Sequence, residues 1–120
     1  MFDSVIFEKA RCSKEERLSC LPTIEYLLSL HKMKQKTGYA SLEAEIAENK
    51  NTMLSKGLLF IVDGASPEIF KKTMMNYVYA SNCIDKNLLE KIIIVDGITF
   101  LHNDHGYSRF MADILISHLG

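Results

Sequence analysis

Hydrophobic side chains recur along most of this chain at the three- and four-residue spacing of amphipathic helices. A broad apolar face begins after Pro22 and consists of Ile24, Tyr26, Leu27, Leu28, Leu30 and Met33. The same spacing continues beyond Gly38, at Tyr39, Leu42 and Ile46. Because one glycine costs a helix only about 1 kcal/mol relative to alanine, the pattern predicts a single helix from Thr23 to about Glu48.

Residues that cap helices mark where several others begin and end. Ser13 followed by Glu16 fits a capping box, so we expect a short helix there that ends before Pro22. Gly64 is suited to close a helix in the left-handed conformation. The sequence Ser66-Pro67-Glu68 then predicts a new helix, because serine caps the first turn and proline has no amide to leave unpaired.

Further apolar stripes complete the predicted fold. Around Gly64 they consist of Leu54, Leu58, Ile61 and Val62 before the glycine, and of Phe70, Met74, Tyr77 and Val78 after it. Two later stripes, separated by a polar break at 103–106, consist of Leu88, Ile92 and Val95, and of Met111, Ile114, Leu115 and His118. We therefore predict an all-α fold, a compact bundle of about five to six amphipathic helices in a single domain over residues 1–120.

A faint internal repeat runs through the second half of the chain. Gly57-Leu58-Leu59-Phe60-Ile61 and Gly97-Ile98-Thr99-Phe100-Leu101 share a pattern, and each is followed by a polar break and a helix that contains Phe70 or Phe110. The pattern suggests two helix-break-helix units related by a pseudo-two-fold axis. Chance similarity between two amphipathic helices is the alternative.

A second interpretation treats two apolar runs as buried parallel strands. Leu58–Gly64 and Ile92–Gly97 each end in an acid and a glycine, which would place Asp63 and Asp96 where open parallel sheets bind ligands. Those acids would then hold magnesium or accept a phosphoryl group. Only two such runs occur and no glycine-rich phosphate loop follows them, so the sequence favours the all-α fold.

Composition excludes several classes of function. Lysine and arginine total 14 against 15 for aspartate and glutamate, so no global charge attracts nucleic acid. The longest apolar run, Leu58–Val62, is far shorter than the roughly 20 residues that a membrane-spanning helix needs. The three cysteines, with no paired spacing, are typical of reduced thiols. We expect a cytoplasmic protein without a membrane span.

Several blocks of the sequence resemble one family. They are Gly38–Glu43, Lys56–Leu58, Asp63–Glu68, and the segment from Gly97 through Arg109 to Leu119. Blocks of this kind at these distances are similar to the cytoplasmic part of MotA, the flagellar stator subunit of the MotA/TolQ/ExbB proton-channel family. The resemblance covers about residues 22–119, and residues 1–21 would be an N-terminal extension.

The resemblance implies a cytoplasmic domain without its channel. Family members have four membrane helices, the last two of which lie between the matching segments. Here only a few residues, Ser81–Lys86, occupy that place. The expected function is therefore that of a protein-protein interaction module, not an enzyme and not an ion conductor, whose partner is a flagellar rotor or stator protein.

The resemblance also implies where a partner would bind. Family members contact the rotor electrostatically through a basic residue three positions before the glycine and an acidic residue five positions after it. Glu43 matches the acidic position, whereas Gln35 stands at the basic one between Lys34 and Lys36. These four are the predicted partner-binding residues. An ordinary solvated helix face is the alternative.

Other chemical candidates are weak. His102 and His105 have a spacing that suits a metal, but no further ligands are evident, so we predict no metal, cofactor or catalytic residue. Because 48% of the residues are hydrophobic, a helical homodimer with no role in motility is a further alternative.

Overall fold

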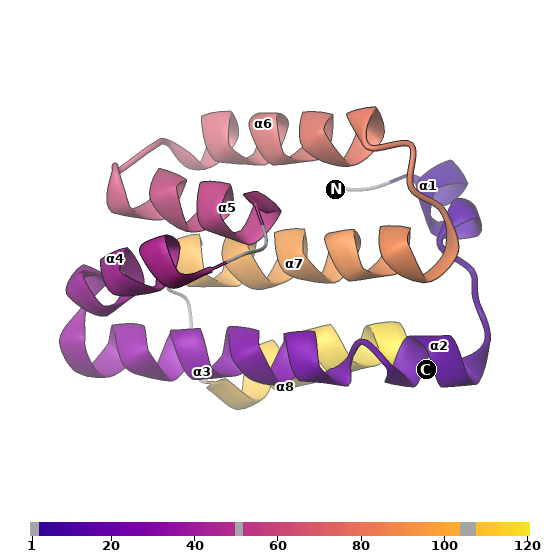
Figure 1. Cartoon of the computed structure of the whole chain (residues 1–120), viewed down its shortest axis with the longest axis horizontal. Helices are drawn as coiled ribbons and strands as arrows, with labels where there is room; N and C mark the ends of the chain where they lie inside the picture. Colours follow the sequence, from indigo (N-terminus) through magenta and orange to yellow (C-terminus); the bar gives the residue numbers. More distant parts are fainter. Residues whose placement is uncertain (1–2, 50–51, 104–107) are drawn as a thin grey trace.

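The computed structural model describes residues 3–49, 52–103 and 108–120, and across these ranges the protein is helical with no β-strand (Figure 1). The elements in chain order are α1 (Ser4–Lys9), α2 (Lys14–Leu18), α3 (Leu21–Thr37), α4 (Tyr39–Glu48), α5 (Thr52–Val62), α6 (Pro67–Ala80), α7 (Asp85–Asn103), α8 (Ser108–Ile116) and the short 3-10 helix η1 (Ser117–Leu119). The predicted all-α bundle is confirmed.

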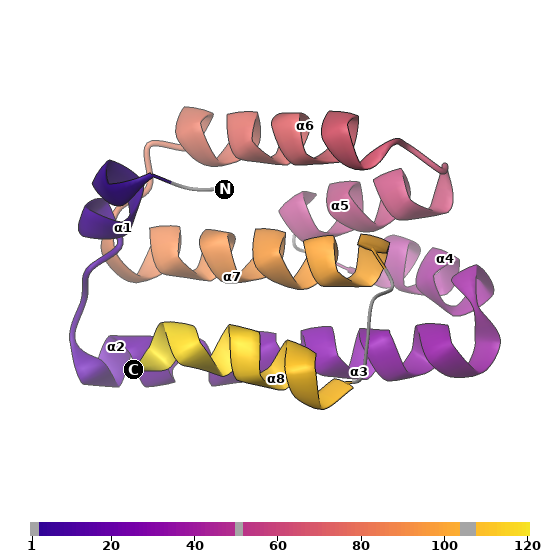
Figure 2. The same cartoon turned by 180° about the vertical axis from the view of Figure 1, so that it is seen from behind.

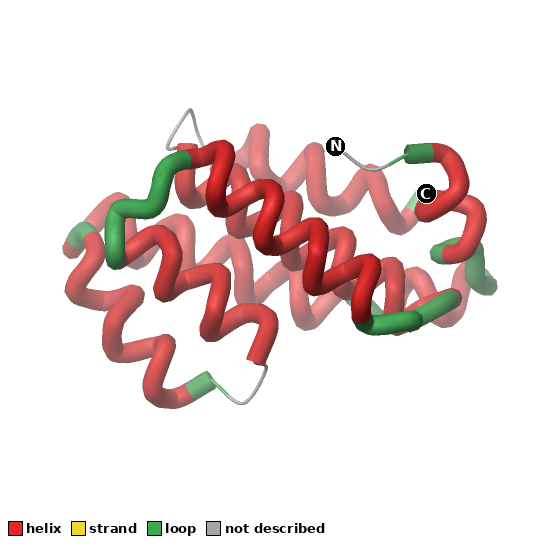
Figure 3. Tube along the Cα trace, turned by 90° about the horizontal axis from the view of Figure 1, so that it is seen from above, coloured by secondary structure: helices red, strands yellow, loops and turns green. Residues whose placement is uncertain are grey.

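The longer helices lie roughly side by side along the longest axis of the molecule (Figures 1 and 2). α7 is central and contacts α3, α5, α6 and α8. α6 lies on one side of it, nearest the viewer when the molecule is seen from above, and α3 and α8 lie on the other (Figure 3). The molecule measures 37 × 27 × 26 Å.

The central position of α7 explains its continuous run of apolar residues. Ile92, Ile93, Ile94 and Val95 are all buried, although consecutive residues of a helix point in directions about 100° apart. A helix with apolar side chains on every side is one that neighbours cover all round. The interpretation of Ile92–Gly97 as a strand was therefore wrong, and so was that of Leu58–Gly64, most of which belongs to α5.

Two buried glycines lie where helices approach each other closely. A β-carbon built at Gly57 would lie 2.3 Å from Ile98 Cδ1, and one at Gly97 would lie 2.7 Å from Leu27 Cδ1. Gly57 thus brings α5 near α7, and Gly97 brings α7 near α3. The two glycines of the faint repeat share this packing role, while the pseudo-two-fold axis stays a prediction.

Most of the predicted helix boundaries are confirmed. Ser13 and Glu16 form a capping box at the start of α2. Gly64 adopts a φ of +74° beyond the end of α5, and the Ser66 hydroxyl accepts a hydrogen bond from the Ile69 amide at the start of α6. Pro22 was expected to precede a helix, and the structure instead includes it in the first turn of α3, where its missing amide leaves nothing unpaired.

The predicted continuous helix from Thr23 to Glu48 was wrong. Gly38 has a φ of +71° and a ψ of −151°, so the backbone turns sharply between α3 and α4. Three side chains of the predicted apolar faces are also exposed: Tyr39 by 50%, Tyr77 by 37% and Ile114 by 47%. Helical spacing identifies the apolar side of a helix, but it does not show where a neighbouring helix stops covering that side.

In the part of the chain that the structure describes, no helix is both long enough and apolar enough to span a membrane. This finding agrees with the expectation drawn from the short apolar runs of the sequence.

Candidate functional site

The corner between α3 and α4 carries the residues predicted to bind a partner. Gly38 is the cap residue between the two helices: it follows the last residue of α3 and precedes the first residue of α4. Its amide donates to the Lys34 carbonyl at 2.8 Å. Gln35, Lys36 and Glu43 are exposed around this corner. Tyr39, the first residue of α4, is half exposed beside them. We call Gln35, Lys36, Tyr39 and Glu43 the corner surface.

Lys34 is not part of this surface. Its side chain is only 8% exposed, and its ammonium group donates a hydrogen bond to the Leu101 carbonyl near the end of α7. The same nitrogen lies 5.3 Å from the centre of the Tyr39 ring. Helix ends leave carbonyl groups without intrahelical partners, and a lysine that meets one is favoured by the negative end of the helix dipole. Lys34 therefore supports the corner from inside.

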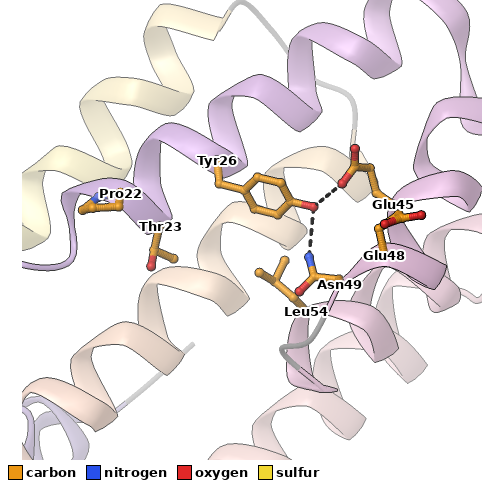
Figure 4. A pocket seen from close by; sticks show the side chains of 7 residues that line it. All are labelled: Pro22, Thr23, Tyr26, Glu45, Glu48, Asn49 and Leu54. Carbon is orange, nitrogen blue, oxygen red and sulfur yellow. Dashed lines mark hydrogen bonds between the residues drawn. The ribbon is translucent and has the colours of Figure 1, made fainter.

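A hydrogen-bond network fixes α4 against α3 on the other side of the turn (Figure 4). The Tyr26 hydroxyl of α3 donates to Glu45 Oε2 at 2.6 Å and accepts from Asn49 Nδ2 at 2.9 Å. Glu45 belongs to α4, and Asn49 follows that helix directly. The network joins residues on both sides of the Gly38 turn, so it sets the angle at which α4 leaves α3.

The same network lines a pocket of about 440 Å³, whose walls are Pro22, Thr23, Tyr26, Glu45, Glu48, Asn49 and Leu54 (Figure 4). Burial and the neighbouring Glu45 carboxylate raise the pKa of Tyr26 to about 12. A phenol with that pKa stays protonated near neutral pH, which makes it a poor general base there. The hydroxyl is therefore suited to hold Glu45 in place, not to exchange protons.

His102 and His118 make contacts that stabilise the fold. His102 Nε2 donates to the Ala65 carbonyl at 2.8 Å, and its ring stacks on Phe70 with centroids 5.1 Å apart. His105, its predicted companion in a weak metal site, lies outside the described residues. His118 Nε2 donates to Asp96 Oδ2 at 2.6 Å. Within the described ranges no cluster of three His, Cys, Asp or Glu side chains could hold a metal ion.

The acids of the strand interpretation do not form a site together. Asp63 is exposed just beyond α5, whereas Asp96 lies within α7 and contacts His118. Neither sits at the end of a strand.

Two thiols are also unsuited to nucleophilic chemistry. Burial is the largest cause that raises the pKa of both Cys12 and Cys20, so both favour the protonated form.

The Tyr26 network could not be found from spacing in the sequence. Tyr26 and Glu45 are 19 residues apart, and the predicted continuous helix would have kept them far from each other. The available signal was Gly38, whose freedom to adopt positive φ permits a turn. Reading that glycine as a corner would have brought α3 and α4 together.

Comparison with models of known families, with curated proteins and with solved structures finds no match to this chain. The site is therefore defined by its own geometry: an exposed corner with charges of both signs and an aromatic ring, held from within by Lys34 and Tyr26.

Proposed function

We propose that this chain is a cytoplasmic, non-catalytic protein-interaction module that resembles the cytoplasmic part of MotA and binds a flagellar rotor or stator protein. The binding site in this proposal is the corner surface. The observation that carries it is the exposure of Glu43, at the acidic position implied by the resemblance, and of Lys36, one position after the expected basic one, on either side of the Gly38 turn. Charges placed in this way steer a partner of complementary charge and set its orientation.

Two further features support this proposal. Tyr39 is 50% exposed in the middle of the surface, and tyrosine provides a large contact area at low conformational cost. Tyr26 fixes α4 to α3, and Lys34 fixes the end of α3 to α7. A surface that is held in one conformation loses less entropy when a partner binds.

Charge reversal at Glu43 tests the proposal. Glu43→Lys is expected to weaken capture of the purified rotor or stator protein by about fivefold, which corresponds to one rim charge pair of about 1 kcal/mol. The loss should shrink as salt rises, because salt screens exposed charges. Binding is measured by biolayer interferometry at several salt concentrations.

A matched control is available on α3. Glu25 is exposed near the end of α3 opposite the Gly38 corner, so Glu25→Lys makes the same change in net charge outside the corner surface. It should leave binding unchanged. Equal binding by the wild type and Glu43→Lys, or equal losses in both variants, would contradict the proposed site.

A second copy of the chain is the other candidate partner, and one observation favours it. Phe110 and Ile114, one turn apart on α8, are exposed by 43% and 47%. Exposed apolar side chains at that spacing suit packing against another helix. Sedimentation velocity over a range of concentrations tests self-association, and a Phe110→Ser/Ile114→Ser double variant should abolish any dimer that uses this face.

A further inference from the structure

A small cleft lies where α5, α6 and α7 meet, on a part of the molecule separate from the corner surface. Its volume is about 160 Å³, and its walls are Met53, Lys56, Tyr77, Ser81 and Lys91. Figure 1 shows the three contributing helices together, with α5 beginning beside α6 and α7. A cavity of this size accommodates one small chemical group but not a nucleotide or a cofactor.

The polar groups of the cleft carry one sign of charge. Lys56 and Lys91 both line it, and no carboxylate of a described residue does. Neither lysine forms an ion pair with any described residue. Two ammonium groups that face a confined space without a counter-charge create a positive potential, which attracts an anion.

A contact within the cleft helps to keep one of these ammonium groups in place. Lys56 Nζ lies 4.6 Å from the centre of the Tyr77 ring, so the ring holds the ammonium over the cleft. The Tyr77 hydroxyl makes no hydrogen bond to a described residue and stays available as a donor. Ser81 lines the cleft but offers no free donor, because its hydroxyl donates to the Val78 carbonyl and accepts from the Cys83 amide.

We propose that this cleft binds the phosphoryl group of a phosphate monoester. The two ammonium groups of Lys56 and Lys91 match the charge of a phosphate monoester near neutral pH, about −1.5 to −2. Lysine binds phosphate as a point charge, and the Tyr77 hydroxyl supplies a third donor. A carboxylate would neutralise only one of the two lysines. This inference is independent of the corner surface.

Titration of the full chain with inorganic phosphate tests the proposal. Amide signals of Lys56, Tyr77 and Lys91 in nitrogen-15 spectra should shift to saturation in phosphate but not in chloride at the same ionic strength. In the Lys56→Gln/Lys91→Gln variant the affinity should fall by at least about tenfold, because two charged hydrogen bonds are lost. Lys56 is exposed, so the single variant Lys56→Gln provides a second test with little risk to folding.

A control variant removes the same two positive charges from a different surface of the protein. Lys71 and Lys72 are exposed on α6 outside the cleft, and Lys71→Gln/Lys72→Gln should keep the wild-type affinity. Shifts that rise linearly with phosphate, or that persist in the cleft variants, would overturn the proposal. A fall of equal size in the control variant would do the same.

Two sources of the phosphoryl group are distinguished by further titrations. A peptide with one phosphoserine among neutral residues and the small ester glycerol phosphate are compared with inorganic phosphate. Tighter binding of the peptide, by at least about tenfold, would identify a phosphorylated side chain of a partner. Tighter binding of glycerol phosphate than of the peptide would identify a small phosphate ester, and equal affinities for all three would show that the cleft recognises the phosphoryl group alone. Equal binding of the phosphorylated and unphosphorylated peptides would contradict the site.

Discussion

The Tyr26 pocket and the cleft at Tyr77 both include a residue of α5 but have opposite charge. Leu54 lines the first and its neighbour Met53 lines the second. In the pocket, the tyrosine hydroxyl is held by a carboxylate and an amide. In the cleft, a tyrosine ring faces an ammonium group, and its hydroxyl has no partner among the described residues.

The difference separates a structural role from a binding role for the same kind of residue. Tyr26 meets its hydrogen-bonding needs within the protein, so it contributes to the position of α4. Tyr77 and the two lysines donate no hydrogen bond to a residue that the structure describes, and donors without a protein partner in a concave site are what a ligand can satisfy. The contrast can be tested through each tyrosine and through Lys56.

The largest expected effect is on the ionisation of Tyr26. Because its pKa is raised from about 10 to about 12, Tyr26 should remain mostly protonated in the folded protein at pH 11. The wild type and Tyr26→Phe should therefore show nearly equal tyrosinate absorbance at 295 nm at that pH. In denaturant the wild type should exceed the variant by one tyrosinate. A full difference in the folded proteins would contradict the buried network.

The same pKa shift predicts how stability changes with pH. The folded state favours the protonated phenol, so its stabilisation is fully present below pH 10 and is lost as pH rises from about 10 to about 12. Between these values the free energy of unfolding should fall more steeply for the wild type than for Tyr26→Phe. Parallel curves would show that Tyr26 titrates alike in both states.

The next-largest expected effect is on the free energy of unfolding at neutral pH. Tyr26→Phe removes one hydrogen bond to a carboxylate and one to an amide, and should lower the free energy of unfolding by about 1.5 kcal/mol. Tyr77→Phe keeps the ring beneath Lys56 and loses no bond to a described residue, so its effect should lie within about 0.5 kcal/mol. Urea unfolding compares the two. Similar losses would remove the distinction between the two regions.

The smallest effect is expected at Lys56. In the absence of phosphate, Lys56→Gln removes an exposed contact between a cation and a ring, worth about 0.5 kcal/mol. Thermal unfolding followed by circular dichroism measures the change. A much larger loss would mean that Lys56 mainly stabilises the nearby carboxyl end of α6, which would weaken the case for a ligand site.

The sequence predicted where helices begin and end better than it predicted how the helices pack against one another. The caps at Ser13 and Ser66 act within one turn, and for that reason they were recognisable from local residues. The apolar run Ile92–Val95 fitted both a strand and a central helix, because burial on all sides has no period. The helix could be preferred over the strand only from the whole chain, in which just two such runs occur.

The candidate sites depended on contacts that local sequence does not encode. Lys34 lies between Lys32 and Lys36, each two positions away, and only its contact with Leu101, 67 residues later, shows that it is buried. Lys56, Tyr77 and Lys91 come from three helices. Their meeting is determined by the packing of α5 and α6 on α7, which a list of residue types cannot reveal.

The Lys34 contact also has a mechanical consequence. A load applied to the corner would pull on the last turn of α3, and the hydrogen bond to Leu101 connects that turn to the end of the central helix. Because α7 touches α3, α5, α6 and α8, the load would be shared by most of the bundle. Under force, the corner and the core should therefore yield together, as one unit.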